Sequence, residues 1–138
     1  MSLDGGPRCR EDGAVDHIDA PGLEALPVLS HAVRERGIVY CSGQVPLRPD
    51  GSLIEDDVDA MTRQVVANLE QVLVAASVTI ADVVRTNVYL ADMADYAAMN
   101  AAYVELFPHR PARTCVAVAA LPLGARVEID CIAVRSAG

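Results

Sequence analysis

The sequence predicts an α+β fold in which two helices cover one face of a single β-sheet. Residues 58–76 and 92–107 repeat apolar side chains every three or four positions, as amphipathic helices do. Shorter segments rich in β-branched residues precede, separate and follow these two helices. Layering both helices on one face of a sheet would bury the apolar sides of all these elements.

The N-terminal part of the chain is predicted as a tail followed by three strands. Residues 1–14 combine glycines, a proline and mixed charges, so we expect a flexible tail there and a single domain over residues 15–138. The expected strands are residues 15–18, 30–33 and 38–44. A turn at residues 34–37 would join the last two strands as a hairpin.

A capped helix and a strand with one polar face form the middle of the chain. Asp56 or Asp57 can cap the helix. Its buried side would carry Val58, Met61, Val65, Leu69, Val72 and Leu73, and its outer side Arg63, Gln64, Asn68, Glu70 and Gln71. The side chains of residues 83–90 then alternate between the two faces of a predicted strand. One face would carry Arg85, Asn87 and Tyr89, and the other Val84, Thr86, Val88 and Leu90.

A second helix and two strands complete the predicted fold. Asp92 and Asp95 are expected to open this helix, and Pro108 to end it. The final two strands begin near Pro111 and Val127. The order of elements is therefore strands, helix, strand, helix and two strands, which fits the layered arrangement.

Composition and charge exclude several classes of protein. A hydrophobic content of 52% excludes a disordered chain, and no apolar stretch approaches the roughly 20 residues of a membrane helix. The formal net charge of −8 disfavours binding to nucleic acid or to an anionic membrane surface. Because residues 1–13 lack the apolar core of a signal peptide, we expect a cytoplasmic protein.

Metal and cofactor sites have no support in the sequence. The four cysteines form no CxxC pair, and the three histidines are scattered along the chain. Neither a phosphate-binding glycine motif nor a zinc-peptidase motif is present. We therefore expect no metal and no organic cofactor.

Two charged residues lie in otherwise apolar strands near the C-terminus. Arg113 shares a strand face with Cys115, and Glu128 shares one with Asp130. A guanidinium can hold a carboxylate by two parallel hydrogen bonds, and a buried carboxyl group can activate water. If the two strands lie in one sheet, these side chains could project into one cleft for an anionic substrate. The alternative is a salt bridge or two exposed side chains.

Three further residues are candidates for a ligand pocket. Ser42 and Gly43 end a strand, and a glycine there lets a ligand approach backbone amides. A bulge or turn glycine is the alternative interpretation. Asn100 lies in the second helix, where it could donate to a ligand or face solvent.

The motifs of the chain occur in an order that is specific to one family. Residues 40–46 read YCSGQVP, residues 111–116 read PARTCV, and residues 127–133 read VEIDCIA. The pair Leu121-Pro122 lies between the last two of these motifs. Together they resemble the Rid family of reactive-intermediate imine and enamine deaminases, also called YjgF-type proteins. The resemblance extends from about residue 20 to residue 134.

This resemblance implies a chorismate-mutase-like fold and a homotrimer with three sites between subunits. It implies hydrolysis of imines and enamines such as 2-aminoacrylate to 2-keto acids and ammonia, without metal or cofactor. Arg113 would hold the substrate carboxylate, and Glu128 would position or activate the water. The pocket would be lined by Ser42, Gly43, Asn100 and Cys115.

One position departs from the family pattern. Many deaminases of the family carry a Tyr in a GPYSQA-type segment, and Leu29 stands at that position here. The pocket would lose a hydroxyl and gain an aliphatic wall, which favours substrates with apolar side chains. The alternative function is a non-catalytic trimer that binds small carboxylates or a protein partner. Nuclease activity, attached to some relatives, is disfavoured by the acidic charge.

Overall fold

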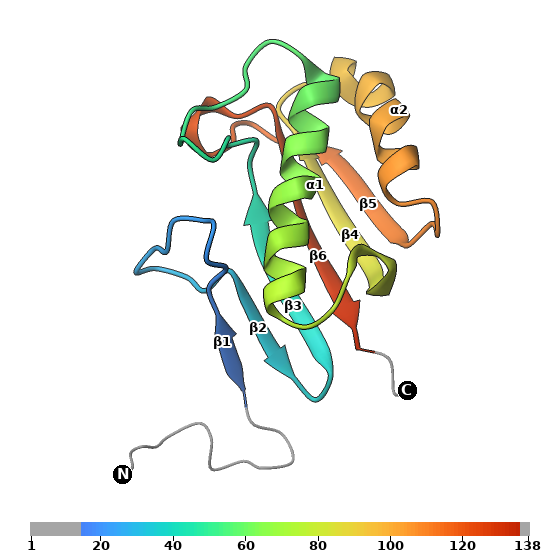
Figure 1. The fold of residues 1–138 in the computed structure, drawn as a ribbon. Coiled ribbons are helices and arrows are strands. Elements are labelled where there is room, and N and C mark those ends of the chain that lie inside the picture. The colour runs from blue at the N-terminus through green and yellow to red at the C-terminus, as the bar shows by residue number, and fades with distance from the viewer. Residues whose placement is uncertain (1–14, 136–138) are drawn as a thin grey trace.

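The computed structural model describes residues 15–135 as a six-stranded sheet with two helices on one face (Figure 1). The strands are β1 Asp16–Ile18, β2 Ala32–Glu35, β3 Ile38–Gln44, β4 Val83–Leu90, β5 Ala112–Ala117 and β6 Val127–Val134. The helices are α1 Val58–Ala75 and α2 Tyr96–Leu106, with single 3-10 turns at η2 Ile80–Asp82, η3 Met93–Asp95 and η4 Pro122–Gly124. The predicted α+β class is confirmed. The expected tail at residues 1–14 lies outside the described residues.

The strand order places the last strand of the chain in the interior of the sheet. The order is β1-β2-β3-β6-β4-β5, so β6 lies between β3 and β4 and pairs antiparallel with both. The strands β4 and β5 pair in parallel, and β5 forms one edge of the sheet. Consequently β5 and β6 are not neighbours, because β4 separates them.

The hairpin between β2 and β3 closes through a turn of two residues. Arg36 and Gly37 both have positive φ angles, 55° and 78°. A pair of positive φ values is typical of the type I′ turn, whose twist matches that of the flanking strands. The hairpin is therefore tighter than the four-residue turn that the sequence predicts, because Arg34 and Glu35 belong to β2.

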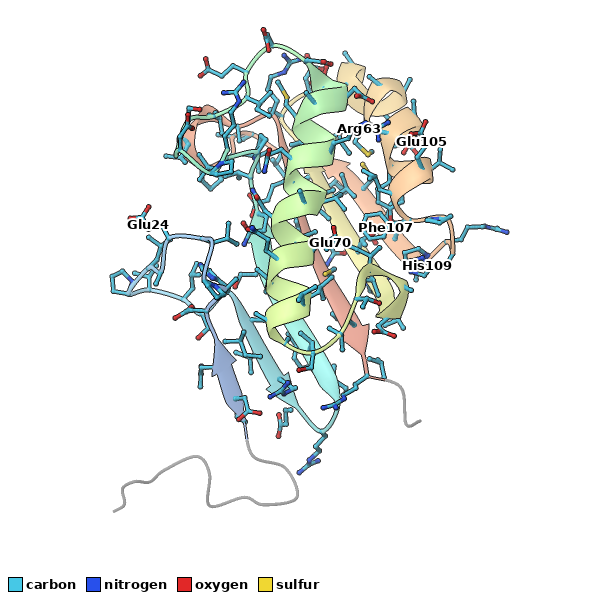
Figure 2. All side chains as sticks on the ribbon, viewed as in Figure 1. Glu24, Arg63, Glu70, Glu105, Phe107 and His109 are labelled. Carbon is cyan, nitrogen blue, oxygen red and sulfur yellow. The ribbon has the colours of Figure 1, made fainter. Side chains whose placement is uncertain are left out.

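The helices form as the apolar spacing predicts, and they bury one side each against the sheet. Asp57, not Asp56, caps α1, with its side chain accepting from the backbone N–H of Asp59 at 3.1 Å. Arg63 of α1 donates to Glu105 of α2 at 2.7 Å, which ties the two helices together on their outer side (Figure 2). Neither helix of the described residues is long and apolar enough to cross a membrane.

Two side-chain orientations differ from the sequence prediction. Asn68, expected on the outer side of α1, is 4% exposed and donates to the carbonyl oxygens of Val45 and Leu47. It therefore holds the segment that follows β3. Val84, expected on the buried face of β4, is 48% exposed because the pairing with β6 shifts register between Val83 and Arg85. An irregularity of this kind reverses the alternation locally.

Candidate active site on two faces of the sheet

Arg113 lies on the helix-covered face of the edge strand β5. Its strand partner Thr86 is buried on that face. The guanidinium donates to Asn100 Oδ1 at 2.7 Å and to the hydroxyl of Tyr96 at 3.2 Å. It also lies over the ring of Tyr103, 4.8 Å from the ring centroid. These contacts fix the orientation of a planar cation that remains partly exposed.

An open hollow of about 340 Å³ lies beside this guanidinium. Its lining residues are Asn100, Tyr103, Val104, Phe107, Arg110, Pro111 and Arg113. Cys115, two residues along β5 from Arg113, shares its face and packs against the core, and burial raises the pKa of its thiol. The structure therefore brings together Arg113, Asn100 and Cys115, three of the predicted site residues.

Glu128 lies on the opposite, uncovered face of the sheet. Its strand partner is Tyr89, one of the polar residues of β4. A Cβ atom added at Gly43 would collide with Glu128 Oε2, so only glycine leaves room for the carboxylate there. Burial, and to a smaller extent the charge of Asp130, raises the pKa of the Glu128 carboxyl group. The side chain is thus a candidate general base.

Ser42 precedes Gly43 near the end of β3 and is bonded to the segment that contains Leu29. The hydroxyl of Ser42 donates to the carbonyl oxygen of Ser30 at 2.7 Å, so it connects β3 to the segment that contains Leu29. His31 holds the same segment, because its ring nitrogens bond to Ala20 N–H and to the carbonyl oxygen of Glu24. Leu29 itself is 42% exposed.

The expectation that Arg113 and Glu128 project into one cleft is wrong within a single chain. Thr86 of β4 pairs with Arg113, whereas Tyr89, three residues further along β4, pairs with Glu128. Residues separated by an odd number along a strand point to opposite faces. The two charged side chains therefore emerge on opposite sides of the sheet, and each belongs to its own group of residues.

Sequence reasoning missed two groups of supporting residues. Tyr96 and Tyr103 lie in the segment that the sequence predicts only as an amphipathic helix, and both contact the Arg113 guanidinium. With Asn100 they follow the spacing of one helical face, which is a signal that the sequence does contain. Asp130 was placed beside Glu128, but its partners Asn87 and Tyr89 on β4 became identifiable only with the strand register.

A larger groove lies elsewhere, between β1 and α1. It has a volume of about 850 Å³, and its lining includes His17, Asp19 and Glu70. None of the predicted site residues lines it, so we place the candidate chemistry at Arg113 and Glu128. Within residues 15–135, no three His, Cys, Asp or Glu side chains are arranged to hold a metal ion.

Comparison with known proteins identifies relatives of this chain by sequence. The family model described as "Endoribonuclease L-PSP" matches residues 19–135. The mitochondrial protein mmf1 of Schizosaccharomyces pombe is 42% identical over 122 residues, which cover 86% of this chain and 75% of mmf1. The 2-iminobutanoate/2-iminopropanoate deaminase of Salmonella typhimurium is 39% identical over 102 residues, covering 71% and 80% of the two chains.

Solved structures match over nearly the same length. The crystal structure of the yeast protein YEO7 superposes with a TM-score of 0.85 at 36% sequence identity, covering 89% of this chain and all of the other. The YjgF gene product of Escherichia coli superposes with a TM-score of 0.77 at 34% identity, covering 87% and 94% of the two chains. Both similarities confirm a Rid-type fold for the described residues.

The expected cytoplasmic location is wrong. The similar proteins mmf1 of S. pombe and MMF1 of Saccharomyces cerevisiae are named as mitochondrial proteins. The expectation depended on the lack of an apolar signal-peptide core. Such a core directs secretion, so its absence argues against secretion but not against import into an organelle. Motifs, fold and relatives, among them one named Reactive Intermediate Deaminase A, together show that the chain belongs to the endoribonuclease L-PSP family, which includes the Rid proteins.

Proposed function

We propose that this protein hydrolyses reactive 2-imino and enamine acids to 2-keto acids and ammonia without a cofactor. The main support is the pair of polar groups on the two faces of the sheet. One is an oriented guanidinium beside an open hollow, and the other is a half-buried carboxyl group with a raised pKa. Two relatives are named as deaminases of this kind, one in Salmonella and one in Arabidopsis.

We further propose that the site is completed between subunits of a homotrimer. Because Arg113 and Glu128 lie on opposite faces of one chain, a site that uses both requires a second copy. The uncovered face also exposes apolar side chains that a neighbouring subunit would cover. These are Tyr40, Val116 and Val134, which are 45%, 40% and 42% exposed. Closed cyclic assemblies can form by such repeated contacts between unlike surfaces.

In the proposed reaction Arg113 binds the substrate carboxylate, and Glu128 of the adjoining subunit takes a proton from water. As the water oxygen bonds to C2, Glu128 passes that proton to the imine nitrogen, which gives a carbinolamine. Glu128 then takes the proton of the new hydroxyl group and passes it to the amino nitrogen, so that the C=O bond forms as the C–N bond breaks and ammonia and the 2-keto acid are released. Because an imine is already electrophilic, positioning of the carboxylate and of one water supplies most of the required catalysis.

The other predicted site residues have supporting roles in this proposal. The backbone of Gly43 approaches the reacting atoms, and Asn100 orients Arg113 through its side-chain oxygen. Cys115 forms part of the wall next to Arg113. Ser42 fixes the segment that contains Leu29. Leu29 adds an aliphatic wall, so we expect imines derived from amino acids with apolar side chains to be preferred.

Replacing Gly43 with Ala is expected to lower kcat by about 10- to 100-fold with little change in stability. The added methyl group occupies the position of Glu128 Oε2, so the carboxylate must move away from the water it activates. Steady-state kinetics on the best imine would measure the effect. Gly22→Ala is the matched control, because its new methyl group meets only the flexible end of Gln71. Equal kcat for Gly43→Ala and wild type would contradict the placement of Glu128 in the site.

The proposed activity can be tested in a coupled assay. An amino-acid oxidase generates imines from a panel of amino acids, and semicarbazide traps the imine that escapes hydrolysis. We expect the wild-type protein to reduce semicarbazone formation, and the Arg113→Ala variant to leave it unchanged. No reduction with any amino acid, combined with measurable binding of a 2-keto acid, would instead establish a non-catalytic carboxylate-binding protein.

A further inference from the structure

A second carboxylate lies beside Glu128 on the uncovered face of the sheet. Asp130 follows Glu128 by two residues on β6, so both side chains point to the same side. Asp130 Oδ1 accepts a hydrogen bond from Asn87 Nδ2 at 2.8 Å, and Oδ2 accepts one from the hydroxyl of Tyr89 at 3.0 Å. Both donors are neutral, so they fix the carboxylate in place without cancelling its charge.

The charged and titratable side chains that β3 and β4 place on this face include a single cation, Arg85, among the described residues, and it is bonded elsewhere. Arg85 of β4 donates to the hydroxyl of Thr114 on β5, at 2.6 Å. Tyr40 of β3 lies on this face, because its strand partner is Ile132 of β6. Tyr89 lies opposite Glu128, and its pKa is raised by burial and by its hydrogen bond to Asp130. Within residues 15–135, the negative charge of Asp130 therefore acts on Glu128 with no cation bonded to Asp130.

We propose that Asp130 is a positioning residue whose fixed negative charge keeps Glu128 a strong enough base to accept a proton from water near neutral pH. This inference rests on the proposed function, because it assigns Asp130 a role in the same reaction. A carboxylate next to a like charge holds its proton more tightly, and a base with higher proton affinity removes a proton from water more readily. Burial contributes most to the raised pKa of the Glu128 carboxyl group, and the charge of Asp130 raises this pKa further.

The test compares Asp130→Asn with the wild-type protein over a range of pH. Glu128 acts as a base only when deprotonated, and removing the neighbouring charge lowers its pKa. The acid limb of the kcat profile should therefore move to lower pH, while the plateau value of kcat falls several-fold. Asp130→Glu retains the charge and should restore the wild-type profile. Asp59→Asn, on the outer side of α1, is the matched control and should not move the limb.

A titration without substrate separates this inference from the proposed function. Glutamate labelled with ¹³C at the side-chain carboxyl group is followed by NMR, and the Glu128 signal is identified by its loss in Glu128→Gln. We expect the Glu128 signal to titrate at lower pH in Asp130→Asn than in the wild type. An unchanged titration would overturn the inference even in an active enzyme, as would a shifted titration with an unmoved acid limb. If the wild-type protein hydrolyses no imine, the proposed function fails, and with it the role of Asp130 in turnover.

Discussion

The Glu128→Gln variant is expected to turn over imines about 10²- to 10⁴-fold more slowly than the wild type, with KM changed by only a few-fold. The amide has nearly the same shape as the carboxyl group but cannot accept the proton of the attacking water. Substrate binding should persist because the carboxylate is held by Arg113, on the other face of the sheet. The measurement is kcat and KM on the best imine of the panel.

A control for the Glu128 variant is available on the surface of α1. Glu70→Gln removes an exposed carboxylate that lies at the groove near β1, far in the sheet order from Arg113 (Figure 2). Its kinetic constants should match those of the wild type. A Glu128→Gln variant with unchanged kcat would exclude the carboxylate as the base, and a large rise in KM alone would assign it to binding.

Replacing Arg113 with Ala is expected to lower kcat/KM by about 10²- to 10³-fold, mainly through KM. The variant loses two charge-assisted hydrogen bonds to the substrate carboxylate and leaves that carboxylate without a cationic partner. Arg113→Lys should recover only part of the activity, since a lysine lacks the planar fork and its packing over Tyr103. Arg48→Ala in an exposed loop serves as the control. Wild-type kinetics in Arg113→Ala would refute the proposed substrate contact.

Mixing the two inactive variants provides a direct test of sites shared between subunits. If each site takes Arg113 from one chain and Glu128 from its neighbour, random reassembly of equal amounts of Arg113→Ala and Glu128→Gln gives intact sites. About a quarter of all sites would receive both wild-type side chains. Recovery to about that fraction of wild-type activity is the expected result. Activity that stays at the level of the separate variants would show that one chain supplies both groups.

The local features of the fold could be predicted because they depend on neighbouring residues. The spacing of apolar residues identifies α1 to within one residue, and alternation correctly pairs Arg113 with Cys115 and Glu128 with Asp130 on their respective strand faces. The error at Val84 has the same origin, since a register shift interrupts the alternation on which the prediction relies.

The relation between the two strands that carry the candidate site could not be predicted from spacing. Alternation says which residues of one strand share a face, but not which faces of two strands coincide. That relation depends on β4, which pairs with both strands and fixes the register of each. The buried position of Asn68 was missed for a comparable reason. Its partners, the carbonyl groups of Val45 and Leu47, lie more than 20 residues away in sequence.

The interior position of β6 has a consequence for how the chain folds. The hairpin β2–β3 joins residues close in sequence, and α1 forms from local contacts, so both can appear early. Until residues 127–134 arrive, however, β3 and β4 each present an unpaired edge of backbone N–H and C=O groups. The sheet is therefore completed by its last strand, and an incompletely synthesised or frayed chain exposes two strand edges that β6 pairs in the native molecule.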